Sequence, residues 1–153
     1  MIISVIGAGT CTKEVSSVAE EVGKRIAENG ATLVTGGLGG VMEAASKGAK
    51  EAGGLTVGIL PGSDRGEANP YVDIPVVTGL SHARNIVVVR TGDAVIAVAG
   101  EYGTLSEIAL ALKIGKPVLG INTWENIDGV ISVSSAEEAV KRAIAMVKKY
   151  PPP

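Results

Sequence analysis

Short runs of aliphatic and β-branched residues alternate along the chain with longer segments in which apolar residues recur every three or four positions. The runs have the length of buried strands, and the segments between them have the period of helices that bury one face. Strands are therefore predicted at residues 2–6, 32–35, 56–60, 74–78, 94–98 and 118–121, with a weaker strand at residues 129–133. Strands that alternate with helices are typical of a parallel sheet covered on both faces.

The first helix has one clear apolar stripe, formed by Val15, Val18, Ala19, Val22 and Ile26. The same period predicts further helices at residues 41–52, 81–90, 105–114 and 136–149. Residues 86–89 are four consecutive β-branched residues, which local propensity favours in a strand. We nevertheless interpret this segment as helix, because two parallel strands need a crossover between them.

These elements predict an α/β fold class: a single Rossmann-like, doubly wound domain with a mainly parallel sheet of six or seven strands. The domain is expected to span residues 1–149, and residues 150–153 form a short proline tail. The longest irregular segment is the loop at residues 61–70, which is interpreted either as a mobile surface loop near a ligand or as a tolerant connection.

Composition and charge exclude several classes of binding site and partner. The 153 residues carry 14 Lys and Arg against 16 Asp and Glu, a net charge of −2, so a surface for nucleic acid is not indicated. One cysteine and one histidine exclude a disulfide framework and a structural zinc site, and no metal site is predicted. The sequence has neither the pattern of a signal peptide nor an apolar stretch long enough for a membrane span, so we expect no membrane partner and a cytoplasmic protein.

Most of the 21 glycines lie in turns at one or the other edge of the predicted sheet. Gly30, Gly53, Gly92 and Gly115 each follow a helix, where a left-handed C-terminal cap is expected. Ten others follow strands, on the edge where doubly wound folds bind ligands: Gly7, Gly9, Gly36, Gly37, Gly39, Gly40, Gly62, Gly79, Gly100 and Gly103. This edge is therefore the candidate ligand site.

Two of these loops have the pattern of anion-binding turns. Residues 36–40 and residues 100–104 lie between a strand and a helix, where glycine lets the backbone approach a ligand and helix N–H groups face it. The two loops predict a phosphorylated or nucleotide-like ligand, and the alternative is a glycine-rich fold that binds no phosphate. The dinucleotide fingerprint does not fit, since Thr12 stands where its third glycine should be, and no P-loop motif is present.

Three segments together resemble the SLOG superfamily. They are Gly36-Gly37-x-Gly39-Gly40-Val41-Met42, Ser81-His82-Ala83-Arg84-Asn85 and Ala99-Gly100-x-x-Gly103-Thr104-x-x-Glu107, and the resemblance extends over about residues 1–121. The superfamily includes the LOG cytokinin-activating phosphoribohydrolases, once named lysine decarboxylase-like, and the molybdenum cofactor carrier proteins. The resemblance implies the Rossmann-like fold predicted above and a homo-oligomer, a dimer or larger.

In the LOG enzymes, an Arg-Lys pair and a PGGxGTxxE motif supply the catalytic arginine and glutamate. The resemblance assigns these catalytic positions to Arg84 and Glu107. This chain departs from the pattern at Asn85, which replaces the lysine, and at Glu101, which replaces a motif glycine. A carboxylate at position 101 would repel a phosphate at the same helix N-terminus, so the chain looks more like the carrier branch.

Glu107 also has a structural interpretation. The segment Thr104-Leu105-Ser106-Glu107 has the spacing of a capping box, in which Thr104 would cap a helix and Glu107 would bond back to it. The same pattern recurs at residues 134–137. His82 is interpreted either as a general base or phosphate donor or as a surface residue near a helix start, and Met42 as a packing residue.

The predicted function is a binding protein for a phosphorylated nucleotide-like or pterin-like small molecule, similar to a molybdenum cofactor carrier. No cofactor is expected to be required, and the molybdenum cofactor or a nucleotide would be the bound ligand. Arg84 would supply the countercharge, and the predicted binding residues are Gly7, Gly9, Gly36, Gly37, Gly39, Gly40, Val41, Gly100, Gly103 and Thr104. The alternatives are a phosphoribohydrolase that cleaves the glycosidic bond of a nucleoside 5′-monophosphate and a ligand-free assembly module. Lysine decarboxylation is disfavoured because no lysine is marked for pyridoxal phosphate.

Overall fold

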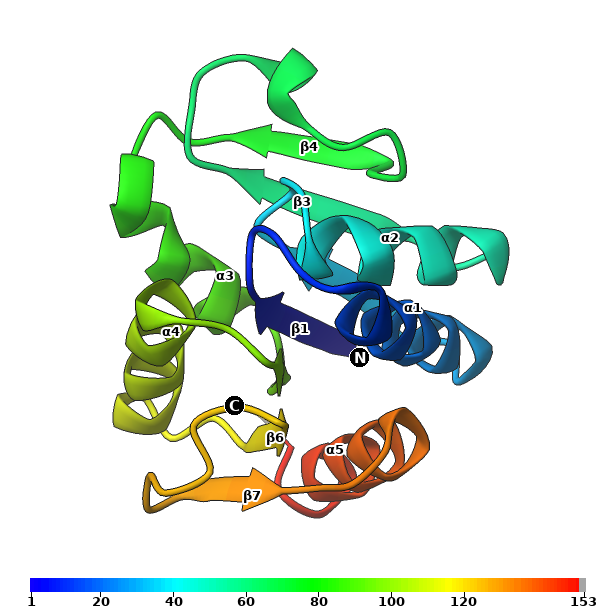
Figure 1. Ribbon diagram of the computed structural model, residues 1–153, viewed down its shortest axis with the longest axis vertical. Coiled ribbons are helices and arrows are strands. Elements are labelled where there is room, and N and C mark those ends of the chain that lie inside the picture. The colour runs from blue at the N-terminus through cyan, green and yellow to red at the C-terminus, as the bar shows by residue number, and fades with distance from the viewer. Residues whose placement is uncertain (152–153) are drawn as a thin grey trace.

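A parallel sheet forms the centre of the molecule (Figure 1), and the computed structural model describes residues 1–151. Within these residues, seven strands pair in the order β4-β3-β2-β1-β5-β6-β7, and every pairing is parallel. They are β1 (Ile2–Gly7), β2 (Thr32–Thr35), β3 (Thr56–Leu60), β4 (Ile74–Val77), β5 (Ala94–Val98), β6 (Val118–Ile121) and β7 (Val130–Ser132). The predicted fold class is confirmed, and the weak strand at residues 129–133 is a three-residue edge strand.

Helices cover both faces of the sheet. Those of the described residues are α1 (Lys13–Glu28), α2 (Val41–Glu51), α3 (Asn85–Thr91), α4 (Tyr102–Lys113) and α5 (Ala136–Lys149), with short 3₁₀ turns η1 (Arg65–Glu67) and η2 (Ser81–Arg84). Figure 1 shows α1, α2 and α5 on one face and α3 and α4 on the other. The last helix ends at Lys149 as predicted, and residues 152–153 of the predicted proline tail lie outside the described residues.

Each face of the sheet has its own apolar core, because side chains alternate between the faces along every strand. Ile3 and Val5 of the central strand pack in the cluster that contains α1, α2 and α5, whereas Ile6 packs with α3 and α4. Ser4 also faces α3, and its buried hydroxyl donates to the Val88 carbonyl oxygen at 2.7 Å. The Ser4 hydroxyl therefore has a hydrogen-bond partner although it is buried in the core.

The two helices α1 and α2 pack backbone against backbone. Gly23 of α1 lies so close to α2 that an added Cβ would overlap the carbonyl oxygen of Ala45. Gly48 of α2 meets the carbonyl oxygen of Glu20 in the same way. Glycine is required at these two positions by the distance between the helices, not by backbone conformation.

Three local predictions are wrong. The helix expected at residues 81–90 is divided into η2 and α3, because the N–H of Asn85 donates to the carbonyl oxygen of His82, as in a 3₁₀ turn. Gly92 is extended, with a φ of −76°, whereas Gly30, Gly53 and Gly115 do adopt the predicted positive φ. Gly92 lies against Ser4 instead, so lack of space explains its glycine.

The third error concerns the start of α4, which is Tyr102 and not residue 105. Ala99 and Gly100 both have positive φ values, 49° and 99°, and these turn the chain into the helix one turn earlier than predicted. Thr104 and Glu107 are therefore inside the helix, and both are buried. The capping box predicted at these residues does not exist.

Candidate functional site

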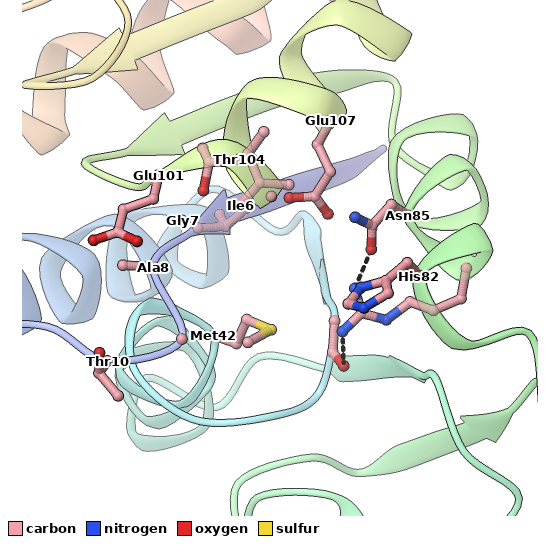
Figure 2. A pocket seen from close by; sticks show the side chains of 15 residues that line it. Ile6, Gly7, Ala8, Thr10, Met42, His82, Asn85, Glu101, Thr104 and Glu107 are labelled. Carbon is pink, nitrogen blue, oxygen red and sulfur yellow. Dashed lines mark hydrogen bonds between the residues drawn. The ribbon is translucent and has the colours of Figure 1, made fainter.

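A cavity of about 340 Å³ lies at the carboxyl ends of the central strands. Its walls are the end of β1 with the loop that follows, the glycine after β2, the junction of η2 and α3, and the first two turns of α4. Strands β2 to β4 lie on one side of β1, and strands β5 to β7 lie on its other side. Open α/β sheets bind ligands at such a switch point in the strand order, here between β1 and β5. Figure 2 shows the side chains that converge on this cavity.

Arg84 forms the cationic wall of the cavity. Its side chain is buried, with 8% of its surface exposed, and Nη2 donates to the carbonyl oxygen of Gly36 at 3.3 Å. Nη1 donates to the side-chain oxygen of Asn85, and Nε has no hydrogen-bond partner within residues 1–151. Gly36 makes this arrangement possible, since an added Cβ would lie 2.7 Å from Nη2. An unpartnered buried donor of this kind is costly unless a ligand satisfies it.

Glu107 lies in the same cavity, and burial determines its chemistry. Loss of solvent raises the pKa of this carboxyl to about 7, and the nearby Arg84 guanidinium offsets only part of the effect. Burial also lowers the pKa of Arg84, against the opposing influence of Glu107. Near neutral pH the carboxyl therefore exists in both protonation states, as groups that take up or release protons in active sites often do.

The N-terminus of α4 forms the wall opposite. Because the helix begins at Tyr102, the N–H groups of its first turn have no partner inside the helix. Glu101 occupies the capping position, and its side chain makes no capping hydrogen bond. Thr104 is 3% exposed and packs against Gly100, so it contributes to the cavity wall from within the helix.

The loop before α4 is fixed from behind by the segment that follows β6. Thr123 donates its hydroxyl to the carbonyl oxygen of Ala99 at 2.6 Å, and the indole N–H of Trp124 donates to the carbonyl oxygen of Glu101 at 3.2 Å. The rings of Tyr102 and Trp124 also pack together, with centroids 6.0 Å apart. Position 101 is therefore held at the cavity by contacts to the backbone on both of its sides.

The structure brings together only part of the predicted binding set. The residues that line the cavity are Gly7, Gly9, Gly36, Gly103 and Thr104, together with Arg84 and Glu107. Gly37, Gly39, Gly40, Val41 and Gly100 lie outside its lining. Two of their N–H groups are used within the protein: Gly37 donates to the Thr35 hydroxyl at 3.0 Å, and Val41 donates to the Ala8 carbonyl oxygen at 2.9 Å.

The loop at residues 36–40 is instead fastened from outside by Asn69. The Asn69 side-chain amide donates to the carbonyl oxygens of Gly37 at 3.2 Å and Leu38 at 2.9 Å. Asn69 belongs to the irregular segment whose role the sequence left open, and the segment supports the glycine loop without lining the cavity. This part of the chain shapes the site indirectly.

Several lining residues were missed or assigned other roles. Met42, interpreted from the sequence as a packing residue, lines the cavity, as do His82, Asn85 and Glu101. The signal was their position beside the recognised motifs: Met42 follows the glycine run, and His82 and Asn85 flank Arg84. Figure 2 places His82 and Asn85 on one side of the cavity and Glu101 on the other, beside Ala8.

Residues 1–149 match the profile of the SLOG cluster4 family. The chain belongs to the SLOG cluster4 family. An uncharacterized protein from Archaeoglobus fulgidus is 49% identical over 145 residues, which cover 95% of each chain. The cytokinin riboside 5′-monophosphate phosphoribohydrolase of Mycobacterium tuberculosis is 35% identical over 127 residues, which cover 76% of this chain and 67% of that enzyme.

Solved structures similar to this SLOG cluster4 chain match it along nearly its whole length. The molybdenum cofactor binding protein from Rippkaea orientalis has a TM-score of 0.90 and 40% identity, covering 95% of this chain and 96% of that protein. The molybdenum cofactor carrier protein from Chlamydomonas reinhardtii has a TM-score of 0.85 and 36% identity, covering 96% and 98%. The resemblance to the SLOG superfamily, with the carrier branch nearer, is confirmed.

Two further observations bear on partners and metals. Within the described part of the chain, no helix combines the length and the apolar character needed to cross a bilayer. In residues 1–151, no three His, Cys, Asp or Glu side chains gather in a group that could hold a metal ion.

Proposed function

We propose that this protein binds a phosphorylated pterin of the molybdenum cofactor type and releases it chemically unchanged. The observation that carries the proposal is the buried Arg84, whose guanidinium group supplies a positive charge to the wall of the cavity. A phosphate group would supply the countercharge. The similarity to two molybdenum cofactor proteins along nearly the whole chain supports the same class of ligand.

The residues present fit such a ligand. The cavity has a volume typical of small-molecule sites, and Gly9 leaves main chain exposed along its wall, against which a flat ring can lie. A ligand of this class would present its phosphate and the polar edges of its ring to the protein. Recognition by the protein therefore falls on the phosphate and on the edges of the ring.

A phosphoribohydrolase is the second candidate, and Glu107 is the observation that favours it. A carboxyl with a pKa of about 7 beside an arginine can stabilise the sugar cation that forms when a glycosidic bond breaks. Two features rank this activity second. Asn85 stands where the LOG pattern has lysine and is bonded to Arg84, and Glu101 places a carboxylate where that pattern has glycine.

The proposal is tested by native mass spectrometry of protein purified from a host that makes the molybdenum cofactor. We expect a bound mass that, after release and oxidation, yields a fluorescent phosphorylated pterin. Arg84→Ala should reduce the bound fraction about 10-fold or more, because a hydrogen bond to a charged group contributes roughly 1.5–3 kcal/mol. Arg90→Ala is the matched control, since Arg90 is an exposed arginine of α3 and does not line the cavity.

The second candidate predicts a different result. Incubation with adenosine 5′-monophosphate would release free adenine, and Glu107→Gln would abolish the release. We expect neither release nor a dependence on Glu107, and rapid release would overturn the ranking. A wild-type protein that carries no pterin, or an Arg84→Ala variant that retains it fully, would refute the carrier proposal.

A further inference from the structure

We propose that Glu101 is the specificity-determining residue of this cavity and that it binds the amino edge of the ligand's pyrimidine ring. The ligand class is a phosphorylated molecule with a 2-amino-4-oxopyrimidine edge, as in pterins and guanine. When the ring edge is bound to Glu101, the phosphate of the ligand lies toward Arg84. The inference rests on the proposed function, because it assigns the two ends of the same ligand.

The position of Glu101 is the first support. It lines the cavity from the N-terminal end of α4, and Figure 2 shows its carboxylate beside Ala8, across the cavity from His82 and Asn85. Within residues 1–151 the carboxylate oxygens make no hydrogen bond or ion pair of the structure, and the residue is exposed. Both oxygens are therefore free to accept hydrogen bonds from a ligand.

The distribution of charge is the second support. The exposed N–H groups at the start of α4 would ordinarily attract a phosphate, but a carboxylate at Glu101 repels one from the same place. The cation of the cavity is Arg84, which is hydrogen-bonded to Asn85, and Figure 2 shows Asn85 across the cavity from Glu101. An anionic ligand is therefore oriented with its phosphate at Arg84 and its ring toward Glu101.

The chemistry of the carboxylate identifies what it binds. An ionised carboxylate only accepts hydrogen bonds, and its two oxygens match two parallel donors on one edge of a ring. A 2-amino-4-oxopyrimidine edge presents such a pair, the ring N–H and the exocyclic amino group. Adenine lacks this pair, and hypoxanthine keeps the ring N–H but lacks the amino group.

The fixed backbone around Glu101 makes the selection effective. The contacts from Thr123 and Trp124 to the carbonyl oxygens of Ala99 and Glu101 hold the loop before the ligand arrives. Because the backbone at Glu101 is already fixed, only the side chain loses conformational entropy on binding, which increases the difference between a ligand that supplies both donors and one that does not.

The experiment measures binding of guanosine and inosine 5′-monophosphates by isothermal titration calorimetry, because these ligands differ by the single amino group. We expect the wild type to bind the guanosine ligand about 10-fold or more tightly than the inosine ligand, as expected for one added hydrogen bond to a charged acceptor. Glu101→Gln should bring the ratio close to one, since its amide group offers one acceptor and opposes a donor with a donor. Neopterin monophosphate should follow the guanosine ligand.

Two further variants separate this role from a general loss of binding. Glu125→Gln removes a carboxylate from a neighbouring loop, at a residue that does not line the cavity of Arg84 and Glu101, and should leave the ratio unchanged. Arg84→Lys should weaken both nucleotides by a similar factor, because the two carry the same phosphate, and should also preserve the ratio.

Equal affinities in the wild type, or a ratio that persists in Glu101→Gln, would overturn the inference. If purified protein still carries a phosphorylated pterin in that case, the proposed function stands and only the role of Glu101 is lost. A wild type that binds none of the three probes also overturns the inference, and a pterin-free native mass spectrum removes the proposed function independently.

Discussion

Glu107 and Arg84 show how burial alone can give an ordinary side chain unusual properties. In the unfolded chain the Glu107 carboxyl has its usual pKa near 4.5, and the fold raises this pKa to about 7 by removing water. The native state therefore holds a proton that the unfolded state releases across this range of pH. Stability linked to this group is fully present below about pH 4.5 and is lost as the pH rises to about 7.

This linkage gives a measurable prediction for Glu107→Gln. The variant cannot ionise, so it should escape the loss and be more stable than the wild type at about pH 8, by on the order of 1–3 kcal/mol. Near about pH 5 the two proteins should be similar. Urea unfolding at several pH values gives the free energy of unfolding of each protein.

Glu28→Gln serves as the control, because Glu28 is an exposed glutamate at the end of α1. Its stability should follow the wild type across the whole range. A Glu107→Gln variant whose stability also runs parallel to the wild type would show that the fold does not raise the pKa of Glu107.

The sequence could identify Arg84 and Glu107 as candidate site residues, but it could not show that the two lie in one cavity. Arg84 and Glu107 stand in recognisable motifs, and the spacing of Glu107 from Thr104 suggested a capping box. The structure shows a related arrangement one residue after the other predicted position: the cap Ser135 accepts from the Glu138 N–H, and Glu138 accepts from the N–H of Ser134, the residue before the cap. Spacing indicates that a box is present, whereas the residue that begins the helix depends on φ values such as that of Ala99.

At the scale of elements, the contact between α1 and α2 depends on two residues that have no side chain. Alanine ordinarily favours a helix over glycine by roughly 1 kcal/mol. At Gly23, however, the added methyl group would enter the backbone of α2 at Ala45. Overpacking of this kind costs about 1–3 kcal/mol, which exceeds the gain in helix propensity.

We therefore expect Gly23→Ala to lower the free energy of unfolding, as measured by urea denaturation, despite its better propensity. Gly103→Ala is the comparison within a second helix, because nothing lies within 4 Å of an added Cβ there. That variant should be as stable as the wild type or more stable. Destabilisation by both changes to the same degree would remove the steric explanation.

The elements differed in how well the sequence predicted them. The central strands follow from short apolar runs, since they are buried on both faces. The amphipathic helices α1 and α5 follow from hydrophobic period, since their exposed faces are polar. The turn η2 before α3 was not predictable in the same way, because it begins at Ser81 with a positive φ that the residue type does not favour. The start of α4 was missed for the same reason.

At the scale of the whole molecule, the parallel topology assembles the site. Residues from β1 to α4, separated by about half the chain or more, meet because all the strands end at one edge. This consequence could be predicted from alternating strands and helices. The sequence did not show which glycine loops would face the ligand, because that depends on whether groups such as the Val41 N–H find a partner inside the protein.

Because Trp124 contacts the loop before α4, the intrinsic fluorescence of the protein should also report whether a ligand is bound. Trp124 is the one tryptophan of the chain, its indole N–H bonds to Glu101, and Glu101 lines the cavity. Indole emission shifts with polarity and hydrogen bonding, so a ligand that engages Glu101 should change the wavelength or intensity of the intrinsic fluorescence. A ligand titration followed by this tryptophan emission should give the affinity found by calorimetry. The Trp124→Phe variant should show no such change in emission. Loading and release can then be timed by rapid mixing of unlabelled protein.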